Sequence, residues 1–129
     1  MINYKTGSAK SIQLNAKDNL TIEPYNPVWP KLAGAEIKTI KGMAGQLSYI
    51  SIEHIGNTVV AGLSSKPIID ILITVQSITE ANHWVKPLET LAYVFSKENS
   101  DKSHWIFSKG MPPFGEKRTH NVHIVESLQ

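Results

Sequence analysis

The chain has 129 residues, of which 41% are hydrophobic and 19% are charged, with a net charge of +2 and no cysteine. This length predicts one domain with one core, and lysines spread along the chain make nucleic-acid binding unlikely. The lack of cysteine excludes disulfides and cysteine-based zinc sites and favours a reducing compartment. Because the sequence has no apolar stretch near the ~20 residues of a membrane span and no apolar block of a secretory signal, we expect a cytoplasmic protein.

The first element with clear start and end signals is a helix. Asn26 is suited to cap its N-terminus, and Pro27 fits the first helical position, where a missing N–H does no harm. Apolar residues recur at helical spacing from Trp29 to Ala44, which predicts one buried face. Gly42 and Gly45 mark the C-terminal end of this helix.

Two strands follow, joined by a turn. The segment 48–56 alternates in character, so that Glu53 and His54 point to opposite faces. The segment 67–75 is rich in β-branched residues and apolar on nearly both faces, which is typical of a central strand in a covered sheet. Asp70 is its single charged residue.

The second half of the sequence predicts a helical region and three more strands. Ser77 and Glu80 fit a capping box that begins a helix running to about Tyr93, and Pro87 predicts a kink or a split into two short helices. The strands are expected at residues 93–95, 104–107 and 118–125. The order α, β, β, α, β, β, β predicts an α+β domain, a mixed β-sheet with helices mainly on one side.

A lone carboxylate among apolar residues makes Asp70 a candidate site residue. Its desolvation is costly without a partner, so it is either a structural residue bonded to loop amides or to Lys66, or a metal ligand or general base. The preceding turn favours the functional interpretation, since Gly56 lets backbone N–H groups approach phosphate oxygens. Asn57 and Thr58 can add donors, Lys66 can meet a phosphate charge, and Mg²⁺ prefers carboxylate and phosphate oxygens.

Other polar residues flank the same turn or lie on the last strand. Glu53 is a candidate second carboxylate for a metal ion. Arg118 is suited to a phosphate, and His123 shares a face with Asn121, whereas His120 points to the other side. Exposed polar residues on an outer strand would produce the same pattern, so both interpretations stay open.

Three blocks of sequence, LTIEPYNPVWP, IEHIGNTVVAGLSSKPIIDI and RTHNVHIVE, resemble the GrpB family in their order and spacing. The resemblance covers about Leu20 to Glu126 and implies a nucleotidyltransferase-like domain at 20–129, behind an N-terminal arm at 1–19. It also implies that Gly56 and Asp70 stand where this fold holds a nucleoside triphosphate and Mg²⁺. Relatives usually continue into C-terminal helices, which a domain ending at residue 129 is expected to lack.

The sequence departs from the family pattern at three positions that matter for catalysis. Asn57 stands where serine is usual after the glycine, and Leu72 stands where an Asp-x-Asp pair has its second acid. Asn121 replaces the first histidine of a His-x-His motif. Leucine cannot bind a metal, so the strand carries one carboxylate where the fold usually has two.

These observations give a leading hypothesis and two alternatives. The leading hypothesis is a metal-dependent nucleotidyltransferase that moves a nucleotidyl group from a triphosphate, with Mg²⁺, to an acceptor that the sequence does not identify. Leu72 favours the first alternative, a non-catalytic nucleotide-binding or regulatory module that binds a phosphorylated small molecule. The second alternative is a transition-metal hydrolase that uses the residues Glu53, His54, His120 and His123.

Overall fold

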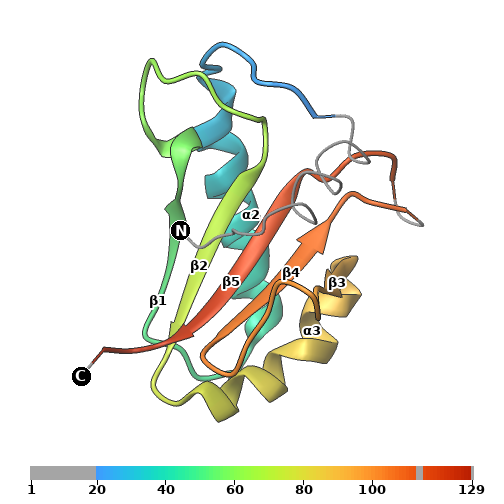
Figure 1. The fold of residues 1–129 in the computed structure, drawn as a ribbon. Coiled ribbons are helices and arrows are strands. Elements are labelled where there is room, and N and C mark those ends of the chain that lie inside the picture. Colours follow the sequence, from blue (N-terminus) through green and yellow to red (C-terminus); the bar gives the residue numbers. More distant parts are fainter. Residues whose placement is uncertain (1–19, 113–114, 129) are drawn as a thin grey trace.

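A five-stranded β-sheet with helices on one face makes up the computed structural model, which describes residues 20–112 and 115–128 (Figure 1). The predicted arm at 1–19 lies outside the described residues. In chain order the elements are α2 (Val28–Ala44), β1 (Ser51–Ile55), the 3-10 helix η1 (Asn57–Val59), β2 (Ile69–Val75), the 3-10 helix η2 (Ile78–Trp84), α3 (Val85–Thr90), β3 (Tyr93–Phe95), β4 (His104–Lys109) and β5 (His120–Glu126). This order is the one predicted from the sequence.

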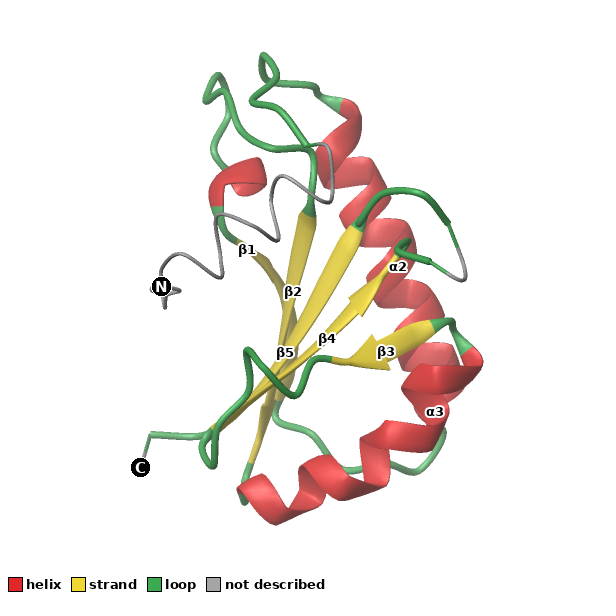
Figure 2. Cartoon of the chain, turned by 45° about the vertical axis from the view of Figure 1, so that its right-hand side comes forward, coloured by secondary structure: helices red, strands yellow, loops and turns green. Residues whose placement is uncertain are grey.

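The sheet is mixed, with strand order β1-β2-β5-β4-β3. Strands β2 and β5 are parallel, and every other neighbouring pair is antiparallel. Helices α2 and α3 lie on the same face of the sheet (Figure 2). We call the opposite face, which is turned to the viewer in Figure 1, the front face. The predicted α+β class is therefore confirmed. No helix in the described ranges is long and apolar enough to cross a membrane.

Helix α2 begins and ends where the sequence predicts. The side-chain oxygen Oδ1 of Asn26 accepts a hydrogen bond of 2.9 Å from the N–H of Val28, which gives a first-turn donor the acceptor it lacks within the helix. Gly45 ends the helix with a φ of 58°, a conformation that glycine adopts without a Cβ penalty. Between these ends the buried residues Trp29, Ala33, Ile40 and Ala44 form the predicted apolar face.

The core lies between this helical layer and the sheet. Strand β2 alternates strictly, so its buried side chains face the helices and its half-buried ones point to the front face. The buried set is Ile69, Ile71, Ile73 and Val75, joined by Val122 and Ile124 from β5 and by Trp84, Leu88 and Phe107. Each fully buried aliphatic side chain contributes about 1.5–3 kcal/mol. This burial fixes which residues of β2 reach the front face.

The capping box predicted at Ser77 is wrong. The hydroxyl of Ser77 lies 2.9 Å from that of Thr79, and no side-chain cap bond forms. The N–H of Ile78 instead donates to a carboxylate oxygen of Glu126, at the end of β5, at 2.9 Å. The cap therefore comes from a residue 48 positions away in the chain. The expected split into two short helices is confirmed, although the second ends at Thr90 rather than near residue 93.

A charged cluster that the sequence did not predict joins α2 to the sheet. Glu36 accepts hydrogen bonds at its Oε2 from the hydroxyl of Tyr93, at 2.7 Å, and from the ammonium of Lys109, at 2.5 Å. Nε2 of His120 lies 3.9 Å from Oε1 of the same carboxylate. The side chain of Glu36 is only 11% exposed, so these partners replace the water that it loses on folding.

The partners decide the charge state of the Glu36 cluster. Burial alone would raise the pKa of Glu36, but the hydrogen bonds from Lys109 and Tyr93 and the nearby positive groups outweigh it and lower the pKa below 4.5. Burial, followed by the bond to Glu36, raises the pKa of Tyr93 and keeps its phenol protonated. Burial also lowers the pKa of His120, partly against the pull of Glu36. Glu36 is therefore a buried anion held by neighbours.

Replacing Glu36 by alanine should destabilise the domain by about 3 kcal/mol, because Lys109 then stays partly buried without its carboxylate. Urea unfolding followed by circular dichroism measures this change. Glu89→Ala, on the exposed side of α3, is the matched control and should change stability by less than about 0.5 kcal/mol. Equal losses in the two variants would contradict the role of the Glu36 cluster.

The pH dependence of stability checks the same cluster. A carboxyl whose pKa is lower in the folded state contributes stability above its unfolded pKa and loses it as the pH falls through the folded value. The natural chain should therefore lose stability as the pH falls below 4.5, and Glu36→Gln should lose less over that range.

Candidate functional site

Asp70 lies on the front face with two side-chain donors from β5. Parallel pairing places Asp70 beside Asn121, two residues before His123 on the same face of β5. Oδ1 of Asp70 accepts a hydrogen bond from Nδ2 of Asn121 at 3.2 Å and lies 3.0 Å from Nε2 of His123. Ser108 of β4 donates to Oδ1 of Asn121 at 2.8 Å, which orients that amide. Strand β5 thus supplies both side-chain partners of this carboxylate oxygen, and β4 orients one of them.

His104 of β4 extends this network. Its Nε2 lies 2.9 Å from Nδ1 of His123, whose side chain is only 4% exposed. The sequence alone shows no partner for His104, because nothing in a single sequence shows that β4 pairs with β5. Burial, and then the proximity of His123, lowers the pKa of His104. The two histidines form a hydrogen-bonded chain that ends on Asp70.

Gly56 lies directly against the other carboxylate oxygen of Asp70. Its φ of 85° and ψ of −169° belong to a region that is essentially restricted to glycine. A Cβ at this position would lie 2.9 Å from Oδ2 of Asp70, closer than real Cβ contacts. Both the conformation and the space therefore require glycine here, and the predicted approach of phosphate to the N–H groups of this turn stays a prediction.

The residues after Gly56 form the short helix η1, and its first two side chains differ in burial. Asn57 is exposed, whereas Thr58 is buried with its hydroxyl 2.8 Å from Nε2 of His54. That hydroxyl is therefore engaged inside the domain. Burial lowers the pKa of His54 despite the opposing effect of Asp70, so the ring favours its neutral form. The first N–H groups of a helix lack acceptors within it, and here they belong to Asn57 and Thr58.

The remaining predicted site residues lie on the front face or at the same edge of the sheet. Glu53 faces forward opposite Leu72, is exposed, and accepts a 2.9 Å hydrogen bond from Ser51. Lys66 and Arg118 are half-buried and precede β2 and β5, the two parallel strands that start beside the Gly56 turn. The structure thus brings Lys66 and Arg118 to the end of the sheet where β2 and β5 begin, whereas Glu53 lies in the middle of β1; the binding roles of all three stay predictions.

The strand register separates the four residues of the hydrolase hypothesis. Glu53 and His123 point to the front face, whereas His54 and His120 point to the helical face, where His120 approaches Glu36. The expected separation of His120 and His123 is therefore confirmed. These four side chains do not converge on one point.

Asp70 has few possible metal ligands around it. The described ranges contain no group of three or more His, Asp or Glu side chains that could hold a metal ion. Oδ2 of Asp70 has no hydrogen-bond donor among the described residues, and the side chain is 27% exposed. Mg²⁺ is commonly bound by one or two carboxylates together with substrate phosphates. Asp70 is thus the one carboxylate of β2, Leu72 offers no ligand beside it, and the binding of Mg²⁺ here stays a prediction.

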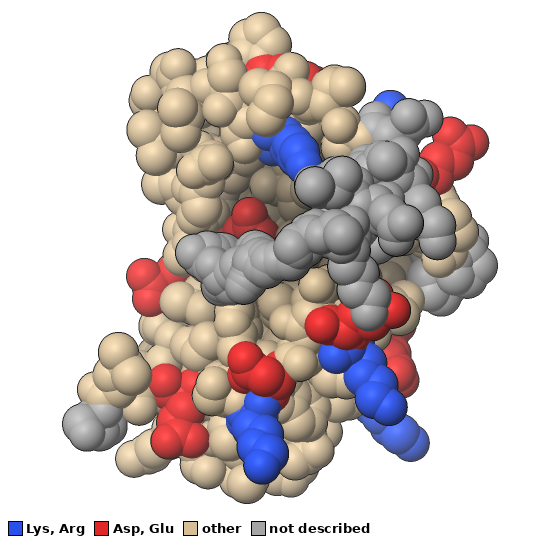
Figure 3. Space-filling view, viewed as in Figure 1, with Lys and Arg blue, Asp and Glu red and all other residues tan. Residues whose placement is uncertain are grey.

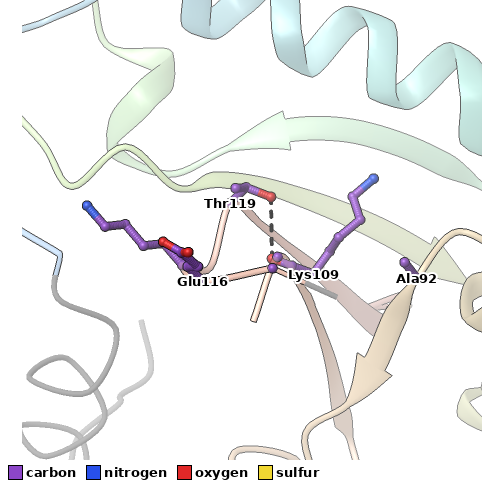
Figure 4. Close-up of a pocket in the computed structure, with 7 residues that line it drawn as sticks. Ala92, Lys109, Glu116 and Thr119 are labelled. Atoms are coloured by element: carbon purple, nitrogen blue, oxygen red, sulfur yellow. Dashed lines mark hydrogen bonds between the residues drawn. The ribbon is translucent and has the colours of Figure 1, made fainter. Parts of the chain in front are cut away.

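A shallow pocket of about 580 Å³ lies at the same end of the sheet but on other residues (Figure 4). Its lining includes Lys109, Gly110 and Thr119. In Figure 4 the ammonium of Lys109 extends toward the helix and away from Glu116, in keeping with its salt bridge to Glu36. Figure 3 shows acidic and basic side chains scattered over the front face rather than gathered in one patch. The pocket therefore adds no ligand to the Asp70 site.

Comparison with known proteins places this arrangement in a family. A family model described as GrpB protein matches residues 19–129. The chain belongs to the GrpB family. A UPF0157 protein of Pseudomonas aeruginosa is 43% identical over 112 residues, which cover 87% of this chain and 46% of that protein. The chain thus spans about half the length of this curated relative.

Solved structures confirm the GrpB fold and show a similar fold in a poly(U) polymerase. The crystal structure of GrpB from Enterococcus faecalis matches with a TM-score of 0.71 and 30% identity, covering 82% of this chain and 61% of that one. The Cid1 poly(U) polymerase with bound MgGTP matches with a TM-score of 0.55 and 14% identity, covering 90% of this chain and 37% of that one. The second likeness shows a shared fold and no more. The expected nucleotidyltransferase-like fold is confirmed.

Gly56→Ala should destabilise the domain by about 1–3 kcal/mol, because alanine is strained in this backbone region and its Cβ meets the Asp70 carboxylate. Thermal and urea unfolding measure the loss. Gly42→Ala, within α2, is the matched control: its Cβ meets nothing within 4 Å, so it should stabilise by about 0.5–1 kcal/mol. A neutral Gly56→Ala would show that the turn relaxes freely and that Asp70 is not held against it.

Proposed function

We propose that this GrpB-family domain binds a nucleoside triphosphate, or a related phosphorylated small molecule, together with one Mg²⁺ at the corner formed by Gly56 and Asp70. The observation that carries the proposal is the state of the Asp70 carboxylate. One oxygen is held by Asn121 and His123, and the other lies beside the glycine turn without a donor among the described residues.

The residues around this corner suit the phosphate end of such a ligand. A glycine turn lets peptide N–H groups approach phosphate oxygens, and Asn57 and Thr58 supply the first N–H groups of η1. Lys66 and Arg118, at the adjacent strand ends, would add positive charge. A cation on Oδ2 of Asp70 would neutralise charge between the carboxylate and the phosphates. The shared fold with Cid1, crystallised with MgGTP, supports a nucleotide as ligand.

Nucleotidyl transfer is the second candidate function, favoured by the same fold likeness. In that reaction an acceptor oxygen forms a bond to the α-phosphorus, the bond to the pyrophosphate oxygen breaks, and pyrophosphate leaves. The acceptor proton must pass to a base. Leu72, beside Asp70 on the front face, leaves the strand with one carboxylate, so binding is the function that the site supports best.

Asp70→Asn should weaken magnesium-dependent nucleotide binding at least about tenfold while leaving the fold intact, because the amide keeps the shape but loses the negative charge. Isothermal titration with ATP, GTP, CTP and UTP, each with and without Mg²⁺, measures the affinity. Glu89→Gln, which removes a distant exposed charge, is the control and should bind like the natural chain. An unchanged isotherm in Asp70→Asn would remove Asp70 from the site.

We expect the 129-residue chain to bind a triphosphate without releasing pyrophosphate, since a single strand carboxylate does not build a two-ion site. Labelled triphosphates, Mg²⁺ or Mn²⁺ and a mixed pool of nucleic-acid, protein and small-molecule acceptors provide the assay. Pyrophosphate release that disappears in Asp70→Asn would reverse this conclusion and identify the domain as a nucleotidyltransferase.

A further inference from the structure

His104 contacts the Asp70 site indirectly, through His123. His104 begins β4 on the front face, diagonally across from His123 on β5, and their rings lie 5.1 Å apart between centroids. His123 is therefore held at both ring nitrogens: Nε2 lies 3.0 Å from Asp70, and Nδ1 lies 2.9 Å from Nε2 of His104. A ring held at both ends has one orientation, whereas a ring held at one end can turn.

The chemistry of the three groups sets the direction of the hydrogen bonds. A carboxylate only accepts, so Nε2 of His123 must carry the hydrogen that reaches Asp70. When the His123 ring carries only this one proton, its Nδ1 is an acceptor, and Nε2 of His104 donates to it. Each of these contacts then has one donor and one acceptor.

We propose that His104 is a positioning residue of the Asp70 site. By donating to Nδ1 of His123, it fixes the imidazole so that Nε2 holds Oδ1 of Asp70, and the carboxylate keeps Oδ2 beside Gly56. Without His104, Nδ1 becomes an unpaired acceptor on a side chain that is only 4% exposed, and the ring can turn to find another donor. Asp70 then keeps Asn121 as its remaining side-chain donor.

The inference rests on the proposed function only for its effect on ligand binding. Groups that orient a metal ligand commonly change metal affinity by 10–100-fold when they are removed. His104 does not contact Asp70 directly but acts on it through His123. We therefore expect its loss to weaken Mg²⁺-nucleotide binding by about tenfold, at the low end of that range.

Nuclear magnetic resonance of the ¹⁵N-labelled natural chain at neutral pH tests the hydrogen-bond direction directly. In both His104 and His123 the proton should lie on Nε2, and the Nε2–H of His123 should exchange slowly with water. A proton on Nδ1 of His123, alone or together with one on Nε2, would overturn the proposal without any variant.

Two substitutions separate positioning from simple packing. His104→Phe keeps a ring but removes the donor, so the slow Nε2–H signal of His123 should be lost and the Mg²⁺-ATP affinity should fall about tenfold. His104→Gln restores an N–H donor, so it should recover at least in part both the slow Nε2–H signal of His123 and the Mg²⁺-ATP affinity. His83→Phe, at an exposed histidine of η2, is the control and should change neither.

The outcomes distinguish this inference from the proposed function. If His104→Phe keeps the slow Nε2–H signal of His123, or if His104→Gln behaves no better than His104→Phe, then His104 does not position the ring. If the natural chain binds no Mg²⁺-nucleotide while the signal of His123 responds to His104 as expected, then the proposed function fails and the positioning role stands.

Discussion

The carboxylate of Asp70 is the constraint around which the front face of the sheet is arranged. A charged group on a strand that is otherwise apolar is costly to desolvate unless its oxygens are paired. Asn121 and His123 pair one oxygen, and the absence of a Cβ at Gly56 leaves room for the other. The polar residues of β5 and the glycine of the turn therefore share one physical reason for being where they are.

This arrangement depends on the opposite face of the sheet. A shift of one residue in strand register would move every side chain to the other face, and Asp70 would then enter the core. The buried isoleucines of β2 oppose such a shift, because moving them to the half-buried positions of the front face would expose part of their apolar surface. The contacts of Glu36 with Tyr93 and Lys109 add fixed points between α2 and strands β3 and β4. The core on the helical face thus fixes the strand register, and the register places the side chains of the Asp70 site on the front face.

Local patterns in the sequence predicted the helices and strands well, but they predicted poorly which distant side chains contact one another. The helix from Asn26 to Gly45 and the isolated charge of Asp70 are visible because spacing and composition carry them. The contact of His104 with His123 depends on the pairing of β4 with β5, which no local pattern records. The cap that Glu126 gives to η2 likewise comes from a distant residue. These misses share one cause, since side chains far apart in the chain meet only through the sheet.

The hydrogen-bond donors around Asp70 also bear on how a cation would bind. Two strand carboxylates close together repel each other, and a metal ion relieves that repulsion. Here a single carboxylate is already satisfied on one oxygen by Asn121 and His123, and Leu72 occupies the neighbouring front-face position. A single carboxylate attracts a cation less strongly than two would. In the proposed complex, most of the attraction for Mg²⁺ would therefore come from the phosphates of the nucleotide, and the ion and the nucleotide would bind together.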